Sequence, residues 1–305
     1  MFSFYKNRRW FFALSALLMV VGILTAVFAG VEMDITFQGG SILKYDFSGT
    51  IDLEQADDAI GKAIGKTVTC QIVTSLGDQA TSLVVNVAGN EALLPENMTQ
   101  LETALAATFP SQTFELQSAN LVDPFIGREL LTKGVWAIVI ASILIVAYVW
   151  FSFRSMSGPS AGVMALVALF HDVILVFFVF VVLRIPLNES LVAVVLSILG
   201  FSINDTIVVY DRIRENERIY NGKMPLPDLV DLSINQSLTR SINTSLCTLG
   251  AVAVAYIFAT AYNIDSIKQF ALPMMIGLVS GTYSSICLAG PLWVMWKTHG
   301  GRTGY

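Results

Sequence analysis

The chain has 305 residues, of which 54% are hydrophobic and 13% are charged, and its formal net charge is −5. A soluble domain of average composition has about 25% charged residues, so this composition excludes an ordinary soluble globular protein and indicates a membrane protein.

Six apolar stretches each have the roughly 20 residues that a helix needs to cross the hydrocarbon core of a bilayer. They are Trp10–Gly30, Gly134–Phe153, Ala161–Leu183, Ser190–Tyr210, Thr244–Tyr262 and Phe270–Trp296. The first follows a basic start, as a signal peptide does, but its apolar run exceeds the roughly 7–15 residues of a signal peptide. We therefore expect an uncleaved first span.

The lysines and arginines near the span ends predict the orientation, because cytoplasmic loops carry an excess of them. If the N-terminus is inside, eleven lie on the inner side: Lys6, Arg8, Arg9, Arg154, Arg212, Arg214, Arg218, Lys223, Arg240, Lys297 and Arg302. Four lie on the outer side: Arg128, Lys133, Arg184 and Lys268. Both termini and the loop 211–240 are therefore expected in the cytoplasm. In that loop, a short helix starting near Asp228 is expected on the membrane surface, and a docking site for a cytoplasmic partner is the weaker alternative.

Residues 31–130, between the first two spans, are expected to form a separate domain outside the cytoplasm. Alternating apolar residues predict strands, and apolar residues at helical spacing predict helices. The strands are expected around Leu43–Phe47, Val68–Ile72, Leu83–Val87 and Phe114–Leu116, the helices around Leu53–Ile64 and Met98–Thr108, and a hairpin turn at Ser75–Asp78. This βαββαβ order is that of a ferredoxin-like α+β domain. The expected fold is therefore a polytopic protein of six transmembrane helices with one such domain between helices 1 and 2, divided as 1–30, 31–130 and 131–305.

No metal-ligand cluster, nucleophile–base pair or phosphate-binding loop stands out, so we expect no enzyme activity, no cofactor and no metal. Gly39-Gly40, where the chain enters the sheet, is expected to form a tight bend rather than a contact site. A single sheet of this size leaves little room for a ligand pocket of roughly 300–1,000 Å³. This argues against the alternative of a small-molecule or lipid exporter.

Asp205 is the most informative residue, because it lies within the apolar run Leu196–Tyr210. A carboxylate inside a span costs roughly 3 kcal/mol on insertion scales, so it favours an ion-carrying role over an inert, satisfied polar group. Arg240 opens the fifth span in the same third of the membrane, so the two side chains could meet. The alternative is that Arg240 extends to the inner head groups.

Other polar residues are weaker candidates for the same site. His171-Asp172 lies near the middle of the third span, where a proton relay and a structural pair are equally plausible. Asn204 and Asn243, next to the two candidates above, are a secondary relay or buried polar support. Gly277-x-x-x-Gly281 in the sixth span is expected to allow close helix packing.

Four runs of this sequence resemble the SecD/SecF family of bacterial protein-export membrane proteins, within the resistance–nodulation–division superfamily. They are Ser202–Glu215, Arg240–Ser245, Phe270–Pro273 with Ile276–Ile286, and His171-Asp172-Val173. The resemblance covers the whole chain, although the outer domain matches only by architecture. Thr36 stands where the family motif after the first span has an aspartate, which leaves the role of that carboxylate open here.

The resemblance implies a partner, SecD, that supplies the other half of a pseudo-symmetric unit, and association with the SecY translocon in the bacterial cytoplasmic membrane. It implies a subunit that pulls a secreted polypeptide outward with the proton gradient after the ATPase SecA has pushed it. It also implies that Asp205 and Arg240 carry the proton coupling. We expect contact with membrane lipid and none with nucleic acid. A passive scaffold, in which Asp205 is dispensable, is a third alternative.

Overall fold

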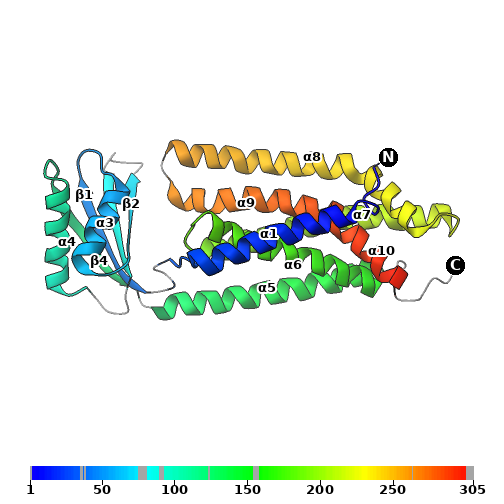
Figure 1. Cartoon of the computed structure of the whole chain (residues 1–305), viewed down its shortest axis with the longest axis horizontal. Helices are drawn as coiled ribbons and strands as arrows, with labels where there is room; N and C mark the ends of the chain where they lie inside the picture. The colour runs from blue at the N-terminus through cyan, green and yellow to red at the C-terminus, as the bar shows by residue number, and fades with distance from the viewer. Residues whose placement is uncertain are drawn as a thin grey trace.

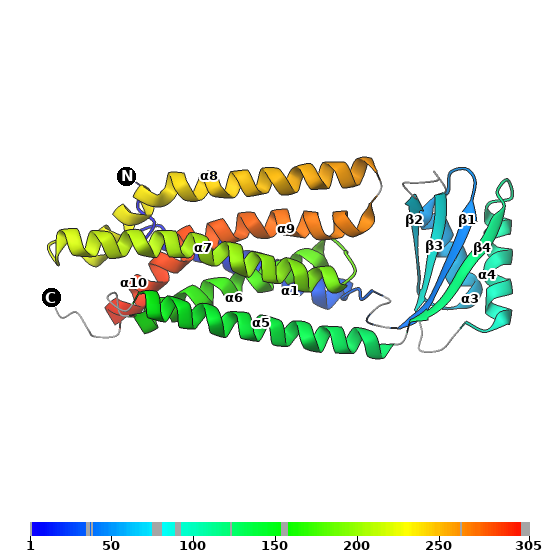
Figure 2. The same ribbon diagram turned by 180° about the vertical axis from the view of Figure 1, so that it is seen from behind.

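The structure is a computed structural model that describes residues 2–34, 37, 39–74, 81–88, 93–122, 124–153, 158–262 and 264–299. A small α/β domain lies at one end of the long axis, and a bundle of long helices makes up the rest (Figure 1). The N-terminus lies at the end of the bundle away from the α/β domain, and the view from behind shows the same arrangement (Figure 2). Thr36, Arg154, Arg302 and the expected turn 75–78 lie outside the described residues.

Among the described residues, six helical segments are long and apolar enough to cross a membrane, which confirms the expected number of spans. They are α1 (Arg8–Ala29), α5 (Pro124–Ser152), α6 (Gly158–Val182), α7 (Glu189–Tyr220), α8 (Leu226–Ala261), and α9 (Asp265–Ser284) continued through η2 (Ser285–Ala289) into α10 (Gly290–His299).

The two helices α7 and α8 are much longer than the predicted spans. They have 32 and 36 residues, about 48 and 54 Å at 1.5 Å per residue, whereas a bilayer core is about 30 Å thick. The segment 211–240, expected as a loop with a short surface helix, is instead the antiparallel continuation of both helices. Only a short turn separates them, with Asn221 and Gly222 at φ 43° and 77°, the left-handed conformation that ends a helix.

The bundle is built around α9, which packs against α6, α7 and α8 (Figure 2). Of the most apolar stretch in each span, 61% is buried in the span that contains α9 and 50% in α7, but only 6% in α8 and 11% in α1. The most apolar stretch of α8 is therefore the least covered by the rest of the chain.

The last span does not run as one continuous α-helix. Pro273 lies inside α9, and η2 is a π-helical turn of five residues, all of them buried. A π turn inside an α-helix frequently occurs at a functional site, because it changes where the flanking side chains point. Here it lies against α7, since the Ser285 Oγ donates a 3.0 Å hydrogen bond to the Ser202 carbonyl.

The α/β domain has four strands and two helices in the predicted order. These are β1 (Gly40–Phe47), α3 (Leu53–Ile64), β2 (Val68–Thr74), β3 (Thr81–Ala88), α4 (Pro95–Thr108) and β4 (Phe114–Val122). The sheet order is β2-β3-β1-β4, and every neighbouring pair is antiparallel. This topology confirms the ferredoxin-like prediction.

The core of this domain follows from the two-residue repeat of the strands. Leu43 and Tyr45 of β1 pair with Val85 and Leu83 of β3, and all four side chains are fully buried. Ile60 of α3 and the α4 residues Leu101 and Leu105 belong to the same core. The helices therefore cover one face of the sheet.

The Asp57 carboxylate of α3 forms a hydrogen bond with the edge strand β2. The Cys70 backbone N–H donates a 2.5 Å hydrogen bond to the Asp57 Oδ1, and the Cys70 side chain is buried. Burial raises the pKa of the Cys70 thiol above its ordinary value, and the neighbouring Asp57 carboxylate raises it further. Burial also raises the pKa of Asp57, against the lowering effect of its hydrogen bond from Cys70.

The linker between α1 and β1 is attached to the turn between α6 and α7. Met33 forms a parallel β-bridge with Leu187, and the Arg184 guanidinium pairs with the Glu32 carboxylate at 2.7 Å. Gly39 has φ 77°, so the chain enters the sheet through a bend that favours glycine, as predicted.

Candidate functional site

Asp205 lies in α7, where it faces α8 and α9. Its side chain is 1% exposed, and the Ser245 Oγ of α8 donates a hydrogen bond of 3.2 Å to its Oδ2. The same hydroxyl lies 2.6 Å from the Thr282 Oγ1 of α9 and 2.8 Å from the Ser241 carbonyl. The Thr282 hydroxyl is a second partner of the Asp205 carboxylate, so this buried group is surrounded by two hydroxyls that are shared with each other.

The structure does not bring Arg240 to Asp205. Arg240 is exposed on α8, and among the described residues no ion pair joins the two. Ser245 is the residue that faces Asp205, and Arg240 lies five residues before it, about 7.5 Å along the helix axis. The sequence placed both residues at a similar depth but could not show which side of α8 each occupies.

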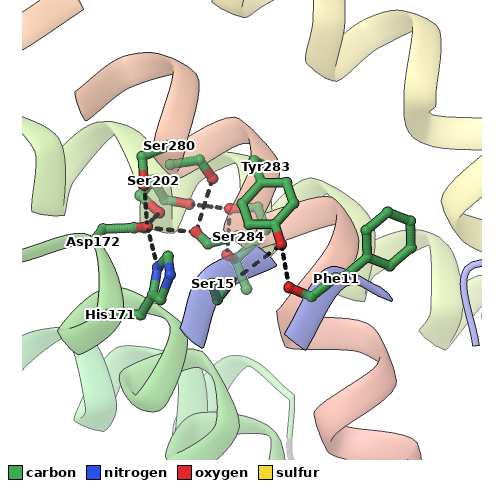
Figure 3. Close-up of polar contacts among 11 residues, drawn as sticks. Phe11, Ser15, His171, Asp172, Ser202, Ser280, Tyr283 and Ser284 are labelled. Atoms are coloured by element: carbon green, nitrogen blue, oxygen red, sulfur yellow. Dashed lines mark hydrogen bonds and ion pairs between the residues drawn. The ribbon is translucent and has the colours of Figure 1, made fainter. Parts of the chain in front are cut away.

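Asp172 is the opposite case, because its carboxylate is fully satisfied (Figure 3). It is 0% exposed, and its Oδ2 accepts hydrogen bonds from the Ser202 Oγ at 2.7 Å and the Ser284 Oγ at 2.6 Å. Its Oδ1 lies 3.1 Å from the Ser280 Oγ and 3.1 Å from the His171 Nδ1. Three serine hydroxyls and one imidazole nitrogen therefore surround the two oxygens of this carboxyl group.

This network, hereafter the Asp172 cluster (His171, Asp172, Ser202, Ser280 and Ser284), joins three helices. His171 and Asp172 come from α6, Ser202 comes from α7, and the two remaining serines come from α9. The Asp172 carboxyl group therefore holds three helices together. This geometry supports the structural role for His171-Asp172 that the sequence left open beside a proton relay.

A second set of contacts extends the same region to α1. The Tyr283 hydroxyl donates a 2.7 Å hydrogen bond to the Phe11 carbonyl and lies 3.2 Å from the Ser15 Oγ (Figure 3). The Tyr283 ring centroid is 6.4 Å from that of His171. The first span is thus tied to α9 next to the Asp172 cluster.

Asn204 and Asn243 are not buried support for the site in this chain. Both are exposed. Asn204 adjoins Asp205 in α7, and Asn243 precedes Ser245 by two residues in α8, so both lie near the depth of Asp205. Uncovered amides at that depth would meet hydrocarbon unless another protein covered them.

The two glycines of α9 lie where this helix crosses α6 and α7. A Cβ on Gly277 would stand 1.9 Å from the Ile198 Cδ1 and 3.0 Å from the Val176 Cγ2. A Cβ on Gly281 would stand 3.1 Å from the Ser202 Cβ. The glycines therefore permit the approach that brings Ser280 and Ser284 to Asp172.

Sequence reasoning missed the hydroxyl partners of both carboxylates, namely Ser202, Ser245, Ser280, Thr282 and Ser284. One signal could have indicated part of this set. Ser280 and Ser284 are four residues apart, which places them on one face of a helix. Nothing in the sequence assigns that face to Asp172 rather than to Asp205.

Two surface grooves are relevant to the function. An apolar groove of about 470 Å³ between α8 and α9 is lined by Ser245 and Thr282, so the hydroxyls around Asp205 reach the edge of the bundle. An open groove of about 570 Å³ lies between α3 and α4. This groove is open to the surface, so the expectation that the outer domain has little room for a ligand pocket stays a prediction. Among the described residues, no group of three or more His, Cys, Asp or Glu side chains could hold a metal ion.

Known proteins match both the sequence and the fold. Residues 100–299 match the family described as protein export membrane protein SecD/SecF, C-terminal. A protein translocase subunit SecF from Alicyclobacillus acidocaldarius is 33% identical over 302 residues, which cover 97% of this chain and 93% of that relative. A SecF subunit from Thermobaculum terrenum is also 33% identical, with 95% and 93% covered.

Among solved structures, SecDF from Thermus thermophilus, a translocon-associated membrane protein, matches with a TM-score of 0.76 at 29% identity. A second SecDF structure, in a super-membrane-facing form, has a TM-score of 0.72 at 30% identity. The match covers 97% of this chain but 39% of the Thermus chain, so this chain spans about two-fifths of that protein.

Proposed function

The chain belongs to the SecD/SecF family of protein-export membrane proteins, and we propose that it is a subunit of the Sec machinery that uses the proton gradient to drive late polypeptide translocation. Its partner in this role is SecD, and it works beside the SecY translocon on secreted chains that SecA has delivered. The setting is the bacterial cytoplasmic membrane, with both termini in the cytoplasm and the α/β domain outside.

The contrast between the two buried carboxylates carries this proposal. Asp172 is contacted by four polar groups from three helices, whereas Asp205 is contacted by two shared hydroxyls, Ser245 at 3.2 Å and Thr282. Hydrogen bonds to a carboxylate favour its charged form, so a carboxylate with fewer of them is better suited to exchange a proton. Asp205 is therefore the group that takes up and releases the proton, and Asp172 holds the helices around it.

The helix α7 also provides a mechanical route to the outer domain. It carries Asp205, and it begins at Glu189, two residues after Leu187, which pairs with Met33 in the linker to β1. A shift of α7 on protonation would therefore move the linker directly. One charge crossing 100 mV is worth about 2.3 kcal/mol, within the roughly 1–3 kcal/mol of a typical coupling energy.

The surface of α7 and α8 supports a partner within the membrane. Asn204, Arg240 and Asn243 are exposed, and only 6% of the most apolar stretch of α8 is buried within this chain. Polar groups at membrane depth are placed toward protein or a water-filled cavity. A SecD partner with the same topology would cover these three side chains and would supply the groups that contact Arg240.

An export assay with membrane vesicles tests the proposal. Asp205→Asn should insert normally but should lower export in the presence of a proton gradient to the rate measured without one. Asp205→Glu keeps a carboxylate and is the matched control, which should retain part of the stimulation. Normal gradient-stimulated export by the Asp205→Asn variant would contradict the proposal and favour a passive scaffold.

The groove between α3 and α4 keeps the exporter alternative testable. If this chain exported a small molecule or a lipid, substitutions in the groove such as Thr103→Phe would abolish its activity and leave polypeptide export unchanged. The relatives at 33% identity are named protein translocase subunits, which favours the polypeptide.

A further inference from the structure

Four serines of α8 lie on one face of the helix and lead away from Asp205. Ser245, Ser241, Ser237 and Ser233 are each four residues apart, and the last three are 1%, 6% and 0% exposed. This set is hereafter the serine stripe. A helix that faced only lipid and apolar neighbours would not need a row of buried hydroxyls.

The two ends of the serine stripe are connected to different environments. At one end, Ser245 donates to Asp205 at 3.2 Å. At the other end, the Asn216 Nδ2 donates to the Ser233 Oγ and to the Gln236 Oε1, both at 2.8 Å. The Gln236 Oε1 also accepts a 2.8 Å hydrogen bond from the Nε of Arg212, and both of these side chains reach the surface.

Ser241 differs from the other three serines. Ser233, Ser237 and Ser245 each donate to the backbone carbonyl four residues earlier, at 2.7, 3.0 and 2.8 Å. The Ser241 Oγ is buried and has no hydrogen-bond partner among the described residues. A buried hydroxyl without a partner costs about 1–3 kcal/mol, so such a group normally binds water.

The spacing of the stripe suits water. Side chains four residues apart on a helix are about 5–6 Å apart, and two hydrogen bonds of about 2.8 Å through one water span the same distance. Ser241 can donate to one water and accept from another, because its proton is not used by the backbone. The three other serines can still accept.

We propose that the serine stripe binds a file of water molecules between α7 and α8, which carries protons between Asp205 and the end of the bundle away from the α/β domain. Ser241 is the central positioning residue of this file. Ser241 accepts a hydrogen bond from one water and donates to the next, while the other three hydroxyls accept from the waters beside them. A proton leaves the file at one end as another enters at the other. The inference rests on the proposed function, because it needs Asp205 to exchange protons.

The test measures how fast Asp205 exchanges its proton in the purified complex in lipid vesicles. Infrared spectroscopy follows the carbonyl band of the protonated carboxyl group after a pH jump, and Asp205→Asn identifies the band. Ser241→Val removes the hydroxyl and should slow the exchange at least tenfold. Ser241→Thr has the same branched shape, keeps the hydroxyl and should exchange within about twofold of the unchanged protein.

Each other outcome has a defined meaning. If Ser241→Val exchanges at the normal rate, protons reach Asp205 by another route, such as the groove between α8 and α9, and the water file is wrong. If Ser241→Thr is as slow as Ser241→Val, packing rather than the hydroxyl controls the rate, which also overturns it. If Asp205 shows no protonated band at any pH, the proposed function fails, and the file fails with it. If Ser241→Val slows exchange while Asp205→Asn exports normally, the file exists but does not serve export.

Discussion

The Ser284 Oγ lies 2.6 Å from the Asp172 Oδ2, and this hydrogen bond joins α9 to α6 across the centre of the bundle. It is the shortest of the four contacts to that carboxylate, and it is made one helical turn after Ser280 makes another. Removal of this carboxyl group is costly, because the buried Ser202 and Ser280 hydroxyls would lose their acceptor.

Asp172 and Asp205 should therefore differ in stability measurements. Asp172→Ala should lower the free energy of unfolding by at least about 2 kcal/mol, since the buried Ser202 and Ser280 hydroxyls lose their acceptor. Asp205→Ala should change it by less than about 1 kcal/mol, because the Ser245 and Thr282 hydroxyls that it releases still bond to each other. Unfolding in detergent micelles measures both. Equal losses would mean that Asp205 is also a structural anion.

Gly277→Ala should destabilise the bundle by about 1–3 kcal/mol, because the new methyl group meets Ile198 and Val176. Ile198→Val removes the nearest carbon atom and should restore part of the loss in the double variant. Gly250→Ala is the matched control, because a Cβ there has no heavy atom within 4 Å. It should be neutral or stabilising by up to about 1 kcal/mol. The free energy of unfolding in one detergent should be compared for the unchanged protein, the two single glycine variants and the double variant.

Arg240→Ala should leave the stability of the isolated chain within about 0.5 kcal/mol, because Arg240 is exposed. It should weaken association with SecD by about 2 kcal/mol or more, as is common for an arginine at an interface. Arg218→Ala, which changes another exposed arginine at the end of α7 beyond the apolar region, is the control and should change neither. The ratio of the two subunits after purification reports the association. A destabilised isolated chain would point to a contact of Arg240 within this subunit instead.

Cys70 should react slowly with alkylating reagents in the folded protein. Because burial and Asp57 raise its pKa, the reactive thiolate forms only at a higher pH than in an ordinary thiol with a pKa of about 8.5. The alkylation rate of Cys70, followed by mass spectrometry, should still increase above pH 9. A cysteine placed at the exposed Thr99 should level off there and should react more than about tenfold faster at pH 7.5. Equal rates at the two sites would show that β2 opens readily.

The sequence was sufficient for features that depend on the local pattern. Alternating residues such as Leu43 and Tyr45 predicted the strands, and runs of about 20 apolar residues predicted the spans, because burial against a sheet or in a bilayer repeats with the geometry of the element. The ends of α7 and α8 were missed. Their charged continuations resemble a loop in composition, but the two helices stabilise each other there through Asn216 and Ser233.

The sequence by itself determined that ionisable groups lie within the spans at Asp172 and Asp205, because a charge in an apolar run is visible without a structure. Only the tertiary structure decided what each carboxylate meets. Asp172 is surrounded by serines that lie 30 to 112 residues away. Asp205 meets Ser245 and Thr282, and Arg240 is exposed on α8. Close packing at positions such as Gly277 decides which helices are neighbours. Because glycine has no side chain, α9 can come close to α6 and α7 there. Residue spacing within one helix does not predict its neighbours, because helix packing depends on the shapes of both surfaces in contact.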